Sequence, residues 1–69
     1  MRVSSRNQLP GTVVSIARGP INALVRIEIA EGVTISATLT SEAVDDLGLA
    51  VGSPAIALFK ATSVLVGVE

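Results

Sequence analysis

Two short polar segments, one near each end of the chain, hold the residues best suited to bind an anion. Residues 4–8 read Ser-Ser-Arg-Asn-Gln and residues 60–63 read Lys-Ala-Thr-Ser. Each segment surrounds a positive charge with hydroxyl or amide donors, which suits a tetrahedral oxyanion. Arg6 and Lys60 are two of only five basic residues in the chain. We therefore predict one oxyanion site that is split across the chain and includes Ser4, Ser5, Arg6, Asn7, Lys60, Ala61 and Thr62.

The start of a short helix offers further donors. Residues 41–47 favour a helix, with Thr40 or Ser41 as its N-cap and Gly48 as its C-terminal stop. The backbone N–H groups and the partial positive charge of a helix start attract anions. Capping and anion contact are compatible, so we include Thr40 in the predicted site. An ordinary capping role for Thr40 and Ser41 is the alternative interpretation.

The rest of the chain is mostly strand-like. Between residues 21 and 29, and again between 33 and 39, apolar residues alternate with polar ones, as in half-buried strands joined by a hairpin. Five strands are predicted in total, over residues 11–17, 21–29, 33–39, 55–59 and 63–68. With one helix between the third and fourth strands, they indicate an all-β protein, a small OB-like Greek-key barrel.

A chain of 69 residues, which we interpret as one domain over 1–69, needs support for its small core. A domain of this size buries only about 60% of the surface that its unfolded chain exposes. The chain has no Cys and no His, so disulfides are excluded and a zinc site is disfavoured. Because 49% of the residues are hydrophobic and the mean hydropathy is +0.68, we expect the surplus apolar surface to be covered by self-association.

Composition also argues against several classes of function. No apolar run approaches the roughly 20 residues that span a membrane, and the first residues lack the apolar stretch of a secretory signal, so we expect a cytoplasmic protein without a membrane partner. A net charge of −1, with one Phe and no Tyr or Trp, argues against an OB-fold that binds nucleic acid. Without His or Cys, and without a supported Ser-Lys pair, an enzyme is disfavoured.

Several segments together resemble the molbindin (Mop) family of molybdate-binding domains. Residues 4–8 are similar to the Ser-Ala-Arg-Asn-Gln start of that family, and residues 60–63 are similar to its late Lys-Ala-Ser/Thr segment. Residues 19–23 (Gly-Pro-Ile-Asn-Ala) and 40–42 (Thr-Ser-Glu) also lie at the family's spacing. The resemblance covers essentially the whole chain.

This resemblance implies a cytoplasmic protein that binds molybdate or tungstate for storage or homeostasis, without an organic cofactor. It further implies a homo-oligomer, a hexamer built as a trimer of dimers, with the oxyanions at subunit interfaces. Related domains occur fused to transcription regulators and to ATPase subunits of molybdate importers. We expect a free-standing storage protein here, with a module that binds a molybdenum-pterin or senses a regulatory ligand as the alternative.

The sequence departs from the family pattern at three positions. Ser5 stands where Ala is usual and adds a hydroxyl, whereas Ala43 lacks one that family members often carry. Thr62 replaces the commoner Ser and keeps the hydroxyl. None of these changes removes a charge, so we expect them to alter affinity rather than ligand identity.

Overall fold

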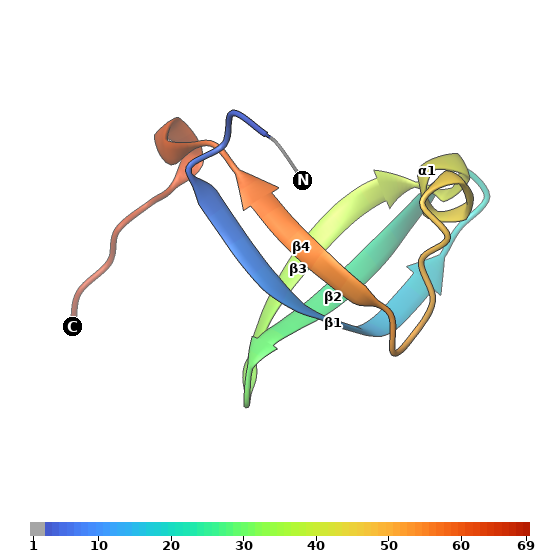
Figure 1. Ribbon diagram of the computed structural model, residues 1–69, viewed down its shortest axis with the longest axis horizontal. Helices are drawn as coiled ribbons and strands as arrows, with labels where there is room; N and C mark the ends of the chain where they lie inside the picture. Colours follow the sequence, from blue (N-terminus) through green and yellow to red (C-terminus); the bar gives the residue numbers. More distant parts are fainter. Residues whose placement is uncertain (1–2) are drawn as a thin grey trace.

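The computed structural model describes residues 3–69 and contains one antiparallel sheet and one α-helix (Figure 1). Its strands are β1 (Asn7–Arg18), β2 (Asn22–Ala30), β3 (Val33–Thr40) and β4 (Pro54–Phe59). The helix α1 (Ser41–Asp46) follows β3, and the 3-10 helix η1 (Ala61–Ser63) follows β4. The strand order is β3-β2-β1-β4. The predicted all-β class with one short helix after the third strand is confirmed.

The long strand β1 belongs to both halves of the sheet. Its first half pairs with β4 from Asn7 to Thr12, and its second half pairs with β2 from Thr12 to Arg18. Pro10 lies where β1 has only β4 beside it, so the missing N–H of proline breaks no pairing with β2. β1 also begins four residues before the predicted start at residue 11.

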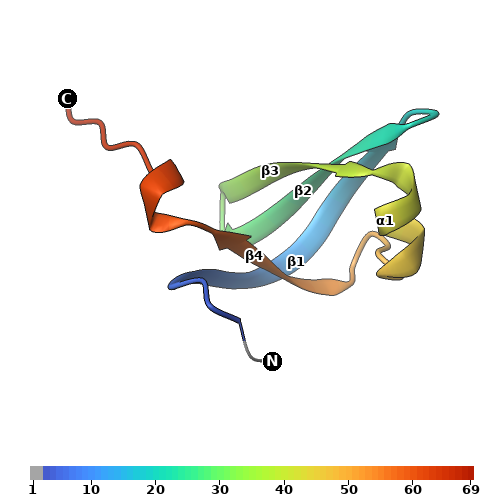
Figure 2. The ribbon, with the colours of Figure 1, turned by 90° about the horizontal axis from the view of Figure 1, so that it is seen from above.

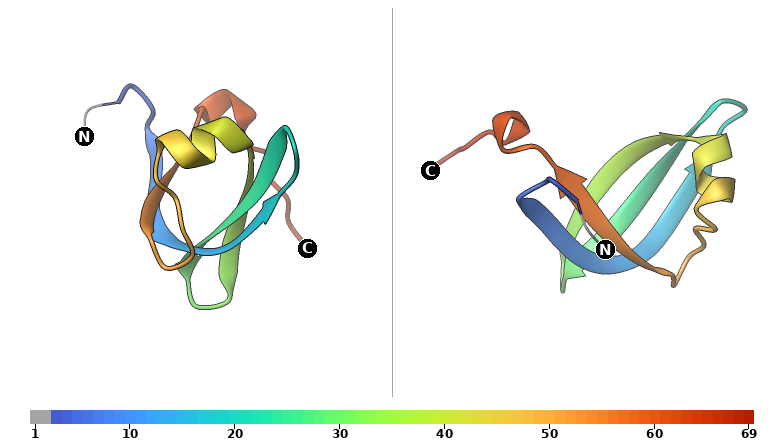
Figure 3. Two further views of the ribbon diagram at one scale, coloured as in Figure 1. Left: turned by 90° about the vertical axis from the view of Figure 1, so that its right-hand side faces the viewer. Right: turned by 45° about the horizontal axis from the view of Figure 1, so that its top comes forward.

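Two features let the sheet curl, as Figures 1 and 3 show. The register of β1 against β2 shifts between Val13 and Ser15, which marks a β-bulge that bends the strand. At the change of partner, a Cβ atom on Gly11 would collide with the backbone carbonyl of Glu28. Glycine is therefore the residue that allows β1 and β2 to approach so closely.

The core fills the inside of the curl. It consists of one buried cluster formed by Val13, Ala23, Val25, Ile27, Val44 and Ala57. Helix α1 lies across one end of the curled sheet (Figure 3, left) and contributes Val44, which is 1% exposed. The N-cap of α1 is Thr40, whose Oγ1 accepts a hydrogen bond from the Ala43 N–H at 3.0 Å.

The predicted fifth strand, over residues 63–68, is wrong. Ser63 ends η1, and residues 64–69 belong to no strand. This tail runs away from the sheet (Figures 1 and 2), and Leu65, Val66 and Val68 are at least 90% exposed. Apolar β-branched residues favour a strand only where a neighbouring strand pairs with them, and within residues 3–69 the tail has no such neighbour.

β3 and β4 are the two edges of the sheet, so no backbone ladder joins them within residues 3–69. The curled sheet is therefore an open barrel along this side. Among the same residues, no helix has the length and apolar character needed to cross a membrane.

Candidate functional site

The register between β1 and β4 brings the two predicted polar segments together. Asn7, the first residue of β1, lies opposite Phe59, the last residue of β4. In an antiparallel pair, the chain before the first residue and the chain after the last residue leave the sheet on the same side. The segment that precedes Asn7 therefore lies beside the segment that follows Phe59, although more than 50 residues separate them in sequence.

These two segments border an open cavity of about 470 Å³. Its lining residues are Ser4, Ser5, Arg6, Leu58, Phe59, Lys60, Ala61 and Thr62. Six of the eight residues predicted from the sequence are among them. Most of the lining is exposed, whereas Ser5 and Phe59 are half-buried. The cavity is thus a surface pocket at one end of the sheet.

The pocket carries positive charge and no carboxylate. Arg6 contributes a guanidinium group and Lys60 an ammonium group, and no Asp or Glu lines the pocket. The ion pair found within residues 3–69 is at the other end of β1, where Arg18 Nη2 lies 3.0 Å from Asp45 Oδ1. Guanidinium and ammonium groups donate hydrogen bonds and accept none. Together with the hydroxyls of Ser4 and Thr62, they form a set of donors suited to an anion.

A serine hydroxyl joins the two sides of the pocket. The Ser5 hydroxyl is 2.9 Å from the carbonyl oxygen of Phe59 and 3.1 Å from that of Asn7, and its single hydrogen is shared between these two acceptors. Gln8 Nε2 donates to the carbonyl oxygen of Ser5 at 2.8 Å. These contacts tie the chain before β1 to the end of β4.

Two predicted residues do not line this pocket. Asn7 is half-buried and lies next to it at the start of β1. Thr40 pairs with Asn22 in the hairpin of β2 and β3, at the end of the sheet that α1 covers. Because β1 runs the length of the sheet between these two ends, one chain does not bring Thr40 to the pocket. A site that contains Thr40 together with Lys60 requires a second copy of the chain.

Two lining residues, Leu58 and Phe59, were not predicted from the sequence. They belong to a strand that was predicted, but no pattern within that strand indicates that its end borders a pocket. Their side of the pocket is apolar, so the polar groups are confined to the two segments outside the sheet.

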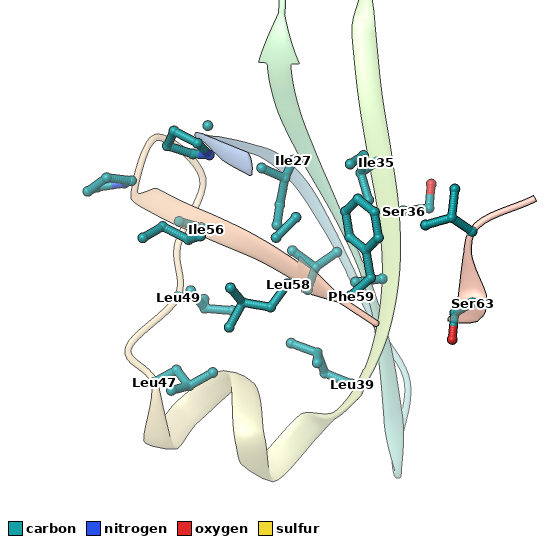
Figure 4. Close-up of a pocket in the computed structure, with 18 residues that line it drawn as sticks. Ile27, Ile35, Ser36, Leu39, Leu47, Leu49, Ile56, Leu58, Phe59 and Ser63 are labelled. Atoms are coloured by element: carbon teal, nitrogen blue, oxygen red, sulfur yellow. The ribbon is translucent and has the colours of Figure 1, made fainter. Parts of the chain in front are cut away.

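A larger cavity of about 1050 Å³ lies between β3 and β4 (Figure 4). Ile35 and Leu39 reach into it from β3, Phe59 from β4, and Leu47 and Leu49 from the segment after α1. Its lining is almost entirely apolar. This cavity is the open side of the barrel, and the sequence alone did not indicate it.

Comparison with known proteins places the chain in a family. The family model of the TOBE domain matches residues 3–66. The chain belongs to the TOBE domain family. This TOBE domain is 54% identical over 69 residues to a probable molybdenum-pterin-binding protein of Haemophilus influenzae, with 100% of both chains covered.

Two solved structures share its fold. MopII from Clostridium pasteurianum has a TM-score of 0.90 and 36% identity, over 97% of this TOBE domain and 100% of MopII. ModG, described as a cytoplasmic molybdate-binding protein with molybdate bound, has a TM-score of 0.92 and 43% identity, over 100% of this TOBE domain and 49% of ModG. These similarities confirm the resemblance to the molbindin (Mop) family and the OB-like architecture.

Proposed function

We propose that this TOBE domain binds molybdate or tungstate in the pocket between residues 4–6 and 60–62. The observation that carries this proposal is the meeting of Arg6 and Lys60 in one cavity that holds no carboxylate. The names of the relatives support the choice of ligand, because ModG was solved with molybdate bound. We further propose that residues 1–69 act as a single domain; residues 1 and 2 lie outside the described part of the chain.

The chemistry of the pocket favours a fully deprotonated anion. Molybdate at neutral pH is a dianion that only accepts hydrogen bonds, whereas phosphate still carries a proton that needs an acceptor. Arg6 offers a fork of two donors, and Lys60 offers a mobile point charge. Discrimination between molybdate and the smaller sulfate then depends mainly on the size of the pocket.

Titration calorimetry on protein freed of bound anions tests this function. We expect molybdate and tungstate to bind much more tightly than sulfate or phosphate. A protein that releases no binding heat with molybdate or tungstate, or that binds all four anions equally, contradicts the proposal.

The ligand undergoes no reaction in this proposal, and the protein stores it or buffers its concentration in the cytoplasm. The description of ModG as cytoplasmic supports that location. Nucleic acid is not a partner in this proposal, because the chain has a net charge of −1 and a single aromatic residue.

A molybdenum-pterin is the second candidate ligand. The Haemophilus influenzae relative, which matches over its whole length, is named as a probable molybdenum-pterin-binding protein. Titration calorimetry also distinguishes the two ligands. A site for a molybdenum-pterin requires the pterin part of the ligand and releases no binding heat with molybdate alone.

We also propose that the protein is a homo-oligomer, a hexamer arranged as a trimer of dimers. Two observations support self-association: the exposed apolar tail over residues 64–68, and the apolar cavity along the unpaired edges of β3 and β4. The tail of a second copy is apolar, as is the lining of this open side, so the two surfaces are suited to cover each other. Assembly also offers the means to bring Thr40 of one subunit toward the pocket of another.

A further inference from the structure

We propose that Ser5 is a positioning residue of the oxyanion site and that it donates no hydrogen bond to the anion. Its hydroxyl holds the segment with Ser4 and Arg6 against the turn with Lys60. This inference rests on the proposed function, because the purpose of the hydroxyl is to preform the pocket. It differs from the prediction made from the sequence, in which Ser5 is a ligand of the oxyanion.

The Ser5 side chain makes a long-range contact across the pocket. Its hydroxyl lies 2.9 Å from the carbonyl oxygen of Phe59, the residue immediately before Lys60. Among the side-chain hydrogen bonds of residues 3–69, this is the one that joins the two segments of the pocket. Beyond the end of the ladder between β1 and β4, the Ser5 hydroxyl therefore links the segment before β1 to the end of β4.

The proton of the Ser5 hydroxyl is already used within the protein. A serine hydroxyl has one hydrogen to donate and two lone pairs that accept. With the carbonyl oxygens of Phe59 and Asn7 both in reach, at 2.9 and 3.1 Å, that hydrogen is used inside the protein. The lone pairs that remain repel a dianion that only accepts hydrogen bonds. The donors left for the anion are those of Ser4, Arg6, Lys60 and Thr62.

The Ser5 hydroxyl also orders the segment that carries Ser4 and Arg6. Ser4 and Arg6 are exposed and precede the first strand, so the sheet itself does not hold them. Apart from the hydroxyl of Ser5, the side-chain contact that fixes this segment is the hydrogen bond from Gln8 Nε2 to the Ser5 carbonyl oxygen, at 2.8 Å. A segment that is ordered before binding loses less entropy when the anion arrives, which raises affinity without any new contact.

The test compares Ser5→Ala with Ser5→Thr, which keeps a hydroxyl. For Ser5→Ala we expect affinity for molybdate about three- to tenfold lower, as the loss of one neutral hydrogen bond implies. Amide hydrogen exchange of residues 4–7 in the ligand-free protein should rise at the same time. Ser5→Thr should restore both measurements toward wild type.

Ser15→Ala is the matched control, because Ser15 is half-buried and lines neither cavity. Weaker binding by Ser5→Ala with unchanged exchange in the ligand-free protein makes Ser5 a direct ligand and overturns the proposal. Faster exchange with unchanged affinity overturns it as well. If the wild-type protein binds no oxyanion, the proposed function itself fails. If the wild-type protein binds molybdate and Ser5→Ala binds it equally well, only the proposed role of Ser5 is refuted.

Discussion

Arg6 and Lys60 line the same pocket because they flank the paired residues Asn7 and Phe59 at one end of the sheet. Two positive charges that face one pocket repel each other, and no carboxylate among the lining residues offsets them. A bound dianion removes this repulsion and gains charge-assisted hydrogen bonds from both side chains. The pairing of β1 with β4 thus creates the electrostatic character of the site.

The first prediction concerns these two charges. Arg6→Ala and Lys60→Ala should each weaken molybdate binding by at least about tenfold and leave the fold intact. Hydrogen bonds to charged groups contribute roughly 1.5–3 kcal/mol, and about 1.4 kcal/mol is a factor of ten in affinity. Calorimetric titration measures the loss, and circular dichroism checks the fold.

Arg26→Ala is the control for lost charge, because Arg26 is exposed on β2 and lines neither cavity. It should bind molybdate nearly as well as the wild type. Unchanged affinity in both pocket variants places the site elsewhere in the protein.

The second prediction concerns the apolar tail. Leu65 is 94% exposed and Val66 is 90% exposed, so Leu65→Asp combined with Val66→Asp changes few contacts within one chain. If the tail covers apolar surface on another copy, the two carboxylates oppose that burial. Light scattering should show a shift from the oligomer toward the 7.0 kDa monomer.

Ala50→Asp is the matched control, because Ala50 is exposed and lies outside both cavities. It adds a negative charge without touching the tail, and the oligomer should persist. A wild-type protein that scatters as a monomer at micromolar concentration rules out self-association.

The third prediction separates two roles of Thr40. Its Oγ1 accepts the capping bond from the Ala43 N–H, so the hydroxyl proton remains available for an anion. Thr40→Asp keeps the acceptor but removes that donor and adds a negative charge. We expect Thr40→Asp to have a melting temperature close to that of the wild type. Its affinity for molybdate should be lower by at least about tenfold.

Thr40→Ala should lose about 1 kcal/mol of folding stability as well, because it lacks the cap. Thr40→Ser keeps both the acceptor and the donor and serves as the control. If Thr40→Asp binds molybdate like the wild type, Thr40 is an N-cap and no part of the site.

The fourth prediction concerns the close approach of β1 and β2. Gly11→Ala places a Cβ atom against the carbonyl oxygen of Glu28, which belongs to the backbone and has little freedom to move. We expect a loss of about 1–3 kcal/mol in the free energy of unfolding, the usual cost of forcing extra atoms into a packed region. Urea denaturation measures it.

The control for this change is Gly67→Ala. An added Cβ atom there meets nothing within 4 Å, so stability should stay near the wild-type value. Equal stability of the two variants implies that β1 and β2 separate at little cost.

Local patterns were sufficient for much of the fold. The alternation of apolar and polar residues predicted β2 and β3, and the capping residue Thr40 with the stop at Gly48 predicted α1. Each of these signals depends on residues close in sequence. The two polar segments of the pocket were also found, because donors gathered around a rare positive charge are visible in the sequence itself.

The features that depend on distant partners were harder to predict. β1 begins at Asn7 because β4 pairs with it there, and residues 63–68 form no strand because nothing in the described chain pairs with them. The acceptor of the Ser5 hydroxyl is the backbone carbonyl of Phe59, which no side-chain pattern indicates. For the same reason, no local pattern indicates that Thr40 lies at the other end of the sheet, opposite Asn22.

The last prediction joins the anion to the assembly. If the pocket of one subunit is completed by groups from another, molybdate links charges that otherwise repel across the interface, and its binding energy adds to the association energy. At a hundredfold excess over the dissociation constant, this amounts to roughly 2.7 kcal/mol per site. Molybdate should therefore raise the melting temperature and the resistance of the oligomer to dilution, whereas sulfate at the same concentration should do much less. A melting temperature that millimolar molybdate leaves unmoved, or that sulfate raises equally, removes the case for a selective site at the interface.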